Sequence, residues 1–329
     1  MQSKRFIILL LTLFSLSLIK SSVAQQPSQC LAVITGVNGN VLIRKADKTE
    51  FAKAYWGTQL FPGDQVKTSA SSEAVLTLSN NSIMKLGSGS DMTMSGNMSS
   101  ATESAGNVRK ISSATMVNLS ALTPNKETRK EVGALAGLRS GSTGNAIELT
   151  SPSNTLIKTD RPSFSWFPKK SFENYIVNLY NSRGLVWSRK VSASTMNYPE
   201  NEKGLVYGES YFWNVEGEAL IDSEKSASQK FSVLSSEKSR EVKEQETLIR
   251  STFYDEPESS SLHSVLGAYY INQGLLQDAI NEFHVISKIN ADAPLPHEIL
   301  GSLYSDVGNK DKAIEELQKA LTLAKNKDK

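Results

Sequence analysis

Apolar residues recur at helical spacing over the C-terminal part of the chain, and the same pattern occurs twice. The motif L-G-x-x-Y-x-x-x-G-x-x-x-x-A-I begins at Leu266 and again at Leu300, an offset of 34 residues. Its period predicts two helices in each copy, and we assign the copies to 260–293 and 294–325 within a helical region over 238–325. A single helix pair leaves its apolar face exposed, so we expect the pairs to stack.

Four glycines of the motif support this interpretation. Gly267 and Gly301 fall inside the first helix of each copy, where the lack of a side chain lets a facing helix come close. Gly274 and Gly308 fall where the first helix must end, and glycine accepts the left-handed backbone of a helix terminus. The motif therefore predicts both the end of each first helix and its close contact with a neighbour.

The repeated motif resembles the tetratricopeptide repeat (TPR). The resemblance implies an α-helical solenoid with a groove along the first helices, in which members of that family hold a peptide or a protein partner. The residues that we place along this groove are Ser261, Ser264, Ala268, Ile271, Asn272, Leu295, Glu298, Ser302, Ser305 and Asp306. The alternative is that the helices form a structural spacer or a self-association surface.

Residues 31–98 alternate between apolar and polar positions and are divided by turns. Asn38-Gly39 marks a hairpin, and Gly63-Asp64 marks a second turn. The pattern predicts short strands in a small β roll or sandwich, which extends to about residue 120 if the polar stretch that follows adds a strand. We expect the carboxylate of Asp64 to cap its turn, although it also has the chemistry of a catalytic group or a metal ligand.

The segments Gly63-Asp64-x-Val66-x-Thr68 and Asn80-Asn81-Ser82-Ile83 resemble the FecR domain. The resemblance implies a periplasmic sensor that passes an iron-uptake signal to an extracytoplasmic sigma factor. Such sensors carry a cytoplasmic helix bundle and one membrane span before the domain, where we expect an export signal instead. A signalling role is therefore the alternative to a scaffold role.

A polar stretch separates this region from a second one with strand patterns. Residues 99–145 predict a linker rich in Ser, Thr, Asn and Gly, with a short helix near 126–138. Short alternating stretches resume over 146–235 and predict a sandwich of the immunoglobulin class. The patterns R-P-x-F-x-W from Arg161 and Y-x-W-x-V from Tyr211 are similar to bacterial fibronectin type III modules.

Three tryptophans of the second strand region allow a different function. Trp166, Trp187 and Trp213 carry flat rings of the kind on which sugars stack, which would suit carbohydrate or peptidoglycan binding. Trp166 and Trp213 are also in phase with apolar neighbours, and buried aromatic residues commonly fill the core of a sandwich. We therefore expect core positions and keep sugar binding as a second alternative.

Residues 1–24 have the order of a secretory signal. Lys4 and Arg5 precede the apolar run Phe6–Ile19, and small residues end the segment at Ala24. The run is short for a membrane-spanning helix. We expect a chain that is exported to the periplasm, the cell surface or the medium, with no transmembrane span after cleavage.

Charge and cysteine usage narrow the classes of partner. The net charge is +2, and it becomes −1 once Lys4, Arg5 and Lys20 leave with the signal. A near-neutral chain without a basic stripe argues against nucleic acid. Cys30 is the only cysteine, so no internal disulfide forms.

The residues offer little for catalysis. His263, His284 and His297 all lie in the helical region, and His263 and His297 occupy equivalent positions of the two copies, which explains their spacing without a metal. The sequence contains no nucleophile elbow, phosphate loop, dinucleotide fingerprint or zinc-ligand spacing. We therefore expect no enzyme activity, no cofactor and no metal site.

These observations predict a multidomain α+β protein. An N-terminal β roll or sandwich, a central immunoglobulin- or fibronectin-like sandwich and a C-terminal helical solenoid follow one another along the chain. The function we expect is that of an exported, non-enzymatic scaffold or adaptor of the bacterial cell envelope. Its partners would be a protein or peptide in the helical groove and an envelope polymer.

Overall fold

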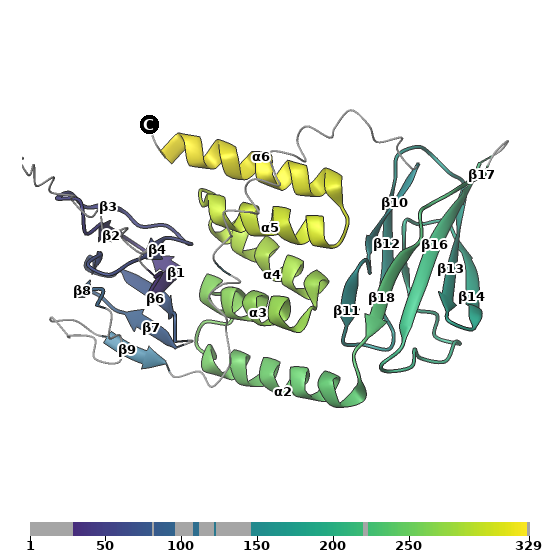
Figure 1. Cartoon of the computed structure of the whole chain (residues 1–329), viewed down its shortest axis with the longest axis horizontal. Coiled ribbons are helices and arrows are strands. Elements are labelled where there is room, and N and C mark those ends of the chain that lie inside the picture. The colour runs from purple at the N-terminus through teal and green to yellow at the C-terminus, as the bar shows by residue number, and fades with distance from the viewer. Residues whose placement is uncertain are drawn as a thin grey trace, which may run out of the picture.

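The protein is an α+β structure, as predicted: mostly antiparallel strands form its N-terminal and central parts, and five helices follow in the described part of the C-terminal region (Figure 1). The computed structural model describes residues 29–80, 82–95, 108–111, 122, 146–219 and 223–327. The predicted signal sequence and the predicted helix near 126–138 lie outside these residues. Among the described residues, no helix has the length and apolar character that a membrane span needs.

The N-terminal strands form two sheets that share one core. The strands are β1 (Ala32–Asn38), β2 (Val41–Arg44), β3 (Ala52–Lys53), β4 (Gln59–Leu60), β5 (Gln65–Thr68), β6 (Glu73–Leu78), β7 (Ile83–Leu86), β8 (Asp91–Thr93) and β9 (Val108–Ile111). One sheet has the order β4-β1-β6-β7-β9 and the other the order β3-β2-β5-β8, and all neighbouring strands are antiparallel. We call these strands the N-terminal module, its first sheet the inner sheet and its second the outer sheet.

The inner sheet is covered on both faces. Val33 and Val75 pack into the core of the helices, whereas their neighbours Ile34 and Leu76 pack into the core between the two sheets. Successive side chains of a strand point to opposite faces, so the inner sheet lies between the outer sheet and the helices. Buried apolar residues on both faces account for the nearly continuous apolar sequence of β6.

The central strands form a second β unit with an aromatic core. The strands are β10 (Ile147–Ser151), β11 (Thr155–Ile157), β12 (Ser163–Pro168), β13 (Asn174–Asn181), β14 (Gly184–Val191), β15 (Thr195–Asn197), β16 (Ser210–Glu218), β17 (Ser223–Lys225) and β18 (Gln229–Val233). One sheet has the order β10-β12-β15, and the other the order β11-β18-β16-β13-β14 with β17 beside β16. Phe164 lies between Trp213 and Trp187 in edge-to-face contacts. We call this unit the central module.

The helices stack between the two modules (Figure 1). They are α2 (Ser236–Thr252), α3 (Ser260–Gln273), α4 (Leu276–Ile289), α5 (Pro294–Asp306) and α6 (Lys310–Lys327). The hydroxyls of Ser235 and Ser259 cap the first turns of α2 and α3, as small polar residues commonly do at helix starts. Gly274 ends α3 in the left-handed conformation, as the motif predicted.

Glycines also set the distance between helices. A Cβ atom on Gly267 would lie 2.8 Å from the ring of Phe283, and one on Gly301 would lie 2.3 Å from the side chain of Leu317. These contacts are closer than real Cβ atoms allow. The expected close approach of α3 to α4 and of α5 to α6 is therefore present.

Candidate functional site

The predicted groove residues lie on α3 and α5, and their exposure differs along the helices. Ser264 and Ala268 are fully buried. Ile271, Glu298 and Ser302 are half-buried, and Asn272, Ser305 and Asp306 are exposed. Of the predicted groove residues named here, only Asn272, Ser305 and Asp306 are exposed, and they lie at the C-terminal ends of the two helices.

The N-terminal module occupies the buried part of this face. The indole Nε1 of Trp56 donates a hydrogen bond of 2.9 Å to Ser264 Oγ, and its ring meets Phe283 edge to face with centroids 6.3 Å apart. Ser261 Oγ donates to the carbonyl of Thr35 at 3.3 Å. Trp56 is 2% exposed, so the contact excludes water and satisfies the polar groups that it buries.

Two glycines of the N-terminal module allow this close contact. A Cβ atom on Gly36 would lie 2.4 Å from Ser261 Oγ, and one on Gly57 would lie 2.5 Å from Leu295 Cδ2. Gly57 also has a φ of +84°, which favours glycine. Ser261 and Leu295 belong to the predicted groove lining, so the chain's own backbone fills the place expected for a partner.

An ion cluster and a cavity border the same contact. Lys85 Nζ lies 2.8 Å from Glu73 Oε1 and also pairs with Glu256, which joins β7 to the segment between α2 and α3. Burial opposes the charge on Lys85, but its hydrogen bonds to Glu256 and Glu73 raise its pKa above the ordinary value. A cavity of about 430 Å³ opens beside these groups, with Glu258 and Ile289 in its lining.

The central module contacts the other ends of the helices. The backbone N–H of Leu156 donates to the carbonyl of Gly274 at 3.0 Å, and the N–H of Leu276 donates to Thr155 Oγ1 at 2.9 Å. Ser153 Oγ donates to the carbonyl of Val307 at 2.7 Å. The strand β11 and the segment just before it thus bind the turns that follow α3 and α5.

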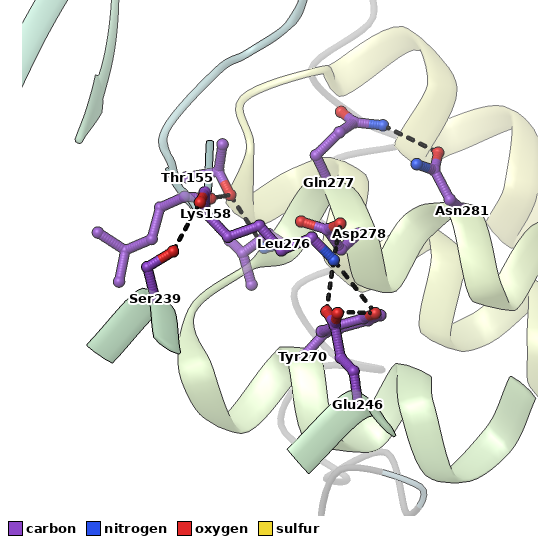
Figure 2. A network of polar contacts seen from close by, with 10 residues as sticks. Thr155, Lys158, Ser239, Glu246, Tyr270, Leu276, Gln277, Asp278 and Asn281 are labelled. Atoms are coloured by element: carbon purple, nitrogen blue, oxygen red, sulfur yellow. Dashed lines mark hydrogen bonds and ion pairs between the residues drawn. The ribbon is translucent and has the colours of Figure 1, made fainter. Parts of the chain in front are cut away.

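A network around Lys158 completes this second contact (Figure 2). Lys158 Nζ pairs with Glu246 of α2 and lies 3.0 Å from Asp278 Oδ1 of α4. It also lies 4.5 Å from the centre of the Tyr270 ring, whose hydroxyl donates to Glu246 Oε1 at 2.7 Å. One lysine from the central module therefore joins three helices.

The environment of this network favours a charged lysine. Burial works against the ammonium of Lys158, but the hydrogen bond to Glu246 and the charge of Asp278 raise its pKa. Burial raises the pKa of Asp278, although the charge and hydrogen bond of Lys158 act to lower it. Burial also raises the pKa of Tyr270. A protonated lysine has no lone pair for attack or proton abstraction, so this arrangement is suited to holding modules together.

The histidines pair with acids at equivalent places of the repeat. His263 Nδ1 donates to Glu282 at 2.5 Å, and His297 Nδ1 donates to Glu316 at 2.6 Å, each partner 19 residues further along the chain. Burial opposes charge on Glu316, but hydrogen bonds from His297 and Lys319 lower its pKa. Within the described part of the chain, no group of three or more His, Cys, Asp or Glu residues could hold a metal.

Another histidine contact joins the two repeats. His284 Nε2 lies 2.6 Å from the hydroxyl of Tyr304. Burial lowers the pKa of His284 and raises that of Tyr304 to about 12. A neutral imidazole and a neutral phenol can share this hydrogen bond, which suits a structural contact between α4 and α5.

The remaining candidates have structural positions. Trp166, Trp187 and Trp213 are buried in the central module, and Trp213 Nε1 donates to the carbonyl of Pro152 at 2.7 Å. None of the three rings therefore presents an open face to a sugar. The carboxylate of Asp64 accepts hydrogen bonds from the backbone N–H groups of Phe61 and Ala46, each at 3.0 Å, and it also pairs with Lys45.

The sequence interpretation did not identify Trp56 and Lys158 as contact residues. Neither belongs to a motif, because each acts on a distant segment. Two sequence features do indicate that these segments are buried on more than one side. Residues Ala74–Leu78 are nearly all apolar, which is typical of a strand covered on both faces. In α3, apolar and small residues surround the helix, which indicates burial on all sides.

Comparison with protein-family models and with characterised proteins gave no match to this chain, so its residues and their geometry carry the functional argument.

Proposed function

We propose that the chain is an exported, non-enzymatic scaffold of the bacterial cell envelope. In this proposal the N-terminal module is FecR-like, the central module is fibronectin-like, and the helices are a short TPR solenoid that holds both. The observation that carries it is the burial of α3 and of its contact residue Trp56, because these helices already bind a folded β module through the face expected to hold a partner.

A protein partner would bind the part of the helical face that stays open. Asn272 lies near the end of α3, and Ser305 and Asp306 lie at the end of α5, all three exposed. These residues are polar, which suits a reversible contact with a solvated rim rather than a permanent apolar interface. The buried residues of the same face would keep the two β modules in a fixed relation while the partner is held.

A retention experiment tests this function. The full-length chain is displayed on beads and exposed to detergent extracts of the cell envelope, and retained proteins are identified by mass spectrometry. We expect a partner that is lost when Asn272→Lys and Ser305→Lys are combined. The matched control combines Ser171→Lys with Ser192→Lys, which places the same two charges on exposed positions of the central module. Retention that is equal for all three chains would refute the helical face as the binding site.

Activity measurements address the non-enzymatic part of the proposal. Lys158, the histidines and the carboxylates described above each make a hydrogen bond or an ion pair within the protein, so we expect no turnover of polysaccharide or small ester substrates by the full-length chain. Turnover that survives purification to homogeneity, and that a single substitution abolishes, would overturn this part.

A further inference from the structure

We propose that the outward face of the outer sheet binds an acidic polysaccharide. The strands β3, β2 and β8 lie on the side of the N-terminal module away from the helices (Figure 1), and β5 lies between β2 and β8 in the same sheet. Alternate residues of these strands, such as Val41 and Val66, fill the core between the two sheets. The residues between them point outward, because side chains alternate along a strand. The inference rests on the proposed function only in its choice of an envelope glycan as the ligand.

The outward residues bring cations together. In the antiparallel register, Leu42 lies opposite Lys53 on one side and opposite Lys67 on the other. Two strand spacings therefore separate the two lysines, about 10 Å in the plane of the sheet. Arg44 extends outward from the next position of the same face. An extended chain of acidic sugars that crosses the strands could contact all three cations.

The positive charge of this face exceeds its negative charge. Among the residues of these four strands, Arg44, Lys53 and Lys67 are the cations and Asp91 is the one acid. Asp91 Oδ2 lies 3.0 Å from Lys67 Nζ, and both side chains remain well exposed. Arg44 donates to Gln65 Oε1 at 2.7 Å, a contact that leaves its charge uncompensated. Attraction to a polyanion follows from this imbalance.

Aromatic rings hold the cations in place. Arg44 Cζ and Lys67 Nζ lie 5.2 Å and 4.9 Å from the centre of the Phe51 ring, and Lys53 Nζ lies 5.6 Å from that of Tyr55. A cation over an aromatic face is attracted to the ring quadrupole and loses part of its freedom before a ligand arrives. Pre-ordered cations lower the entropy cost of binding, which distinguishes this face from scattered surface lysines.

The face is better suited to a glycan than to a membrane or a nucleic acid. The exposed large apolar side chains of the described residues lie in other parts of the chain, so the face has no apolar wedge for a lipid bilayer. Its excess of two positive charges is small for a phosphodiester chain, which depends on many phosphate contacts. An acidic polysaccharide carries more widely spaced charges and pyranose faces that can lie on half-buried aromatic rings.

Binding of the full-length chain to polygalacturonate, with dextran as the neutral probe, tests the proposal. We expect binding to polygalacturonate at low salt that weakens about 10-fold or more at high salt, where charges are screened. Lys53→Glu combined with Lys67→Glu should weaken binding by about 10-fold or more, since two attractions become repulsions. The matched control combines Lys170→Glu with Lys190→Glu, two exposed lysines of the central module that also lie beside acids.

Several results would overturn the proposal. Equal weakening by the two double variants would show that only overall charge matters. Binding to dextran that equals binding to polygalacturonate would show that the charges of this face do not determine polysaccharide binding. Tighter binding to duplex DNA or to anionic phospholipid vesicles would assign the face to a different ligand class.

Circular dichroism of each variant verifies folding. The further variant Phe51→Leu keeps every charge and should weaken binding to polygalacturonate severalfold. A negative result here leaves retention of a protein partner by the helices intact, so the two proposals fail separately.

Discussion

Trp56 and Ser264 are joined by a hydrogen bond of 2.9 Å although 208 positions of sequence separate them. The hydroxyl of Ser264 donates its own proton to the carbonyl of Ser260, so its oxygen is available to accept from the indole. The bond lies in a fully buried contact beside Phe283. A donor and an acceptor that are both removed from water depend on each other, because either one alone would be left unsatisfied.

We predict that Trp56→Ala loosens the N-terminal module from the helices. Removing a buried tryptophan should cost about 3–5 kcal/mol, and the loss should appear first as faster amide hydrogen exchange in α3 and β1. Exchange in β13 and β16 of the central module should stay unchanged. Trp56→Phe keeps most of the ring and should cost less, chiefly the unsatisfied acceptor of Ser264. Unchanged protection of α3 in both variants would contradict the contact.

A second prediction concerns the Lys158 network. Lys158→Met leaves Glu246 and Asp278 together without a cation, and we expect a loss of about 1–3 kcal/mol after allowing for their partial exposure. Chemical denaturation with a probe in the helices measures it. Lys190→Met is the matched control, since Lys190 pairs with Glu218 at an exposed site and should change stability by less than about 1 kcal/mol.

The pH dependence of this variant has a definite sign. Burial already raises the pKa of Asp278, and Lys158 is the main group that lowers it. A carboxyl with a raised folded pKa binds protons more readily in the folded state, so its contribution to stability falls as the pH rises above its ordinary value of 3.8. Loss of Lys158 enlarges this effect. The deficit of Lys158→Met should therefore be greater near pH 7 than near pH 4, and the reverse order would count against the network.

The elements that sequence patterns predicted are those with a local cause. The C-terminal end of α3 and the close approach of α3 to α4 depend on Gly274 and Gly267, whose effect reaches only the next turn or helix. The turn role of Asp64 was predictable for the same reason, because its carboxylate accepts a hydrogen bond from the backbone N–H of Phe61, three residues before it. The alternation of apolar and polar residues predicted an N-terminal β structure for a similar reason, since the buried positions of a strand follow from the sequence of that strand alone.

The arrangement of the modules has no such local cause. Ser264 and Ala268 are small residues on α3, and a small residue suits an open groove as well as a close contact with a β sheet. The sequence favours the contact with a β sheet over the open groove only when β6 and α3 are considered together. The near-continuous apolar run of β6 and the apolar and small residues around α3 both predict burial on every side. Matching two surfaces that are distant in sequence requires the three-dimensional structure.

The histidine–glutamate pairs provide a third prediction. Hydrogen bonds from His297 and Lys319 lower the pKa of Glu316 despite its burial, so its charged form stabilises the fold. This contribution is present above the ordinary pKa of 4.5 and disappears as the pH falls through the lowered value. Glu316→Gln should cost about 1–2 kcal/mol near pH 7, and the difference from the unmodified chain should vanish in acid.

The neighbouring Glu315 supplies the control for this experiment. Its side chain is 60% exposed and pairs with Lys319 at 2.8 Å. Exposed pairs of this kind contribute little, so Glu315→Gln should change stability by less than about 1 kcal/mol at any pH. Thermal or denaturant unfolding from neutral to acid pH compares the two variants, and a Glu316→Gln deficit that persists at the acid end would exclude the proposed ionisation.

A final prediction uses the two repeat glycines. Alanine favours a helix over glycine by up to about 1 kcal/mol, so Gly267→Ala and Gly301→Ala would stabilise an isolated helix. In the folded chain the new methyl group would meet Phe283 at 2.8 Å or Leu317 at 2.3 Å, so the facing side chain or its helix must shift. Overpacking of this kind should cost about 1–3 kcal/mol and outweigh the helical preference. Ser302→Ala, at a half-buried position beside Gly301, tests helical preference without that contact. Stabilisation by either glycine substitution in denaturant unfolding would show that the helices can separate at little cost.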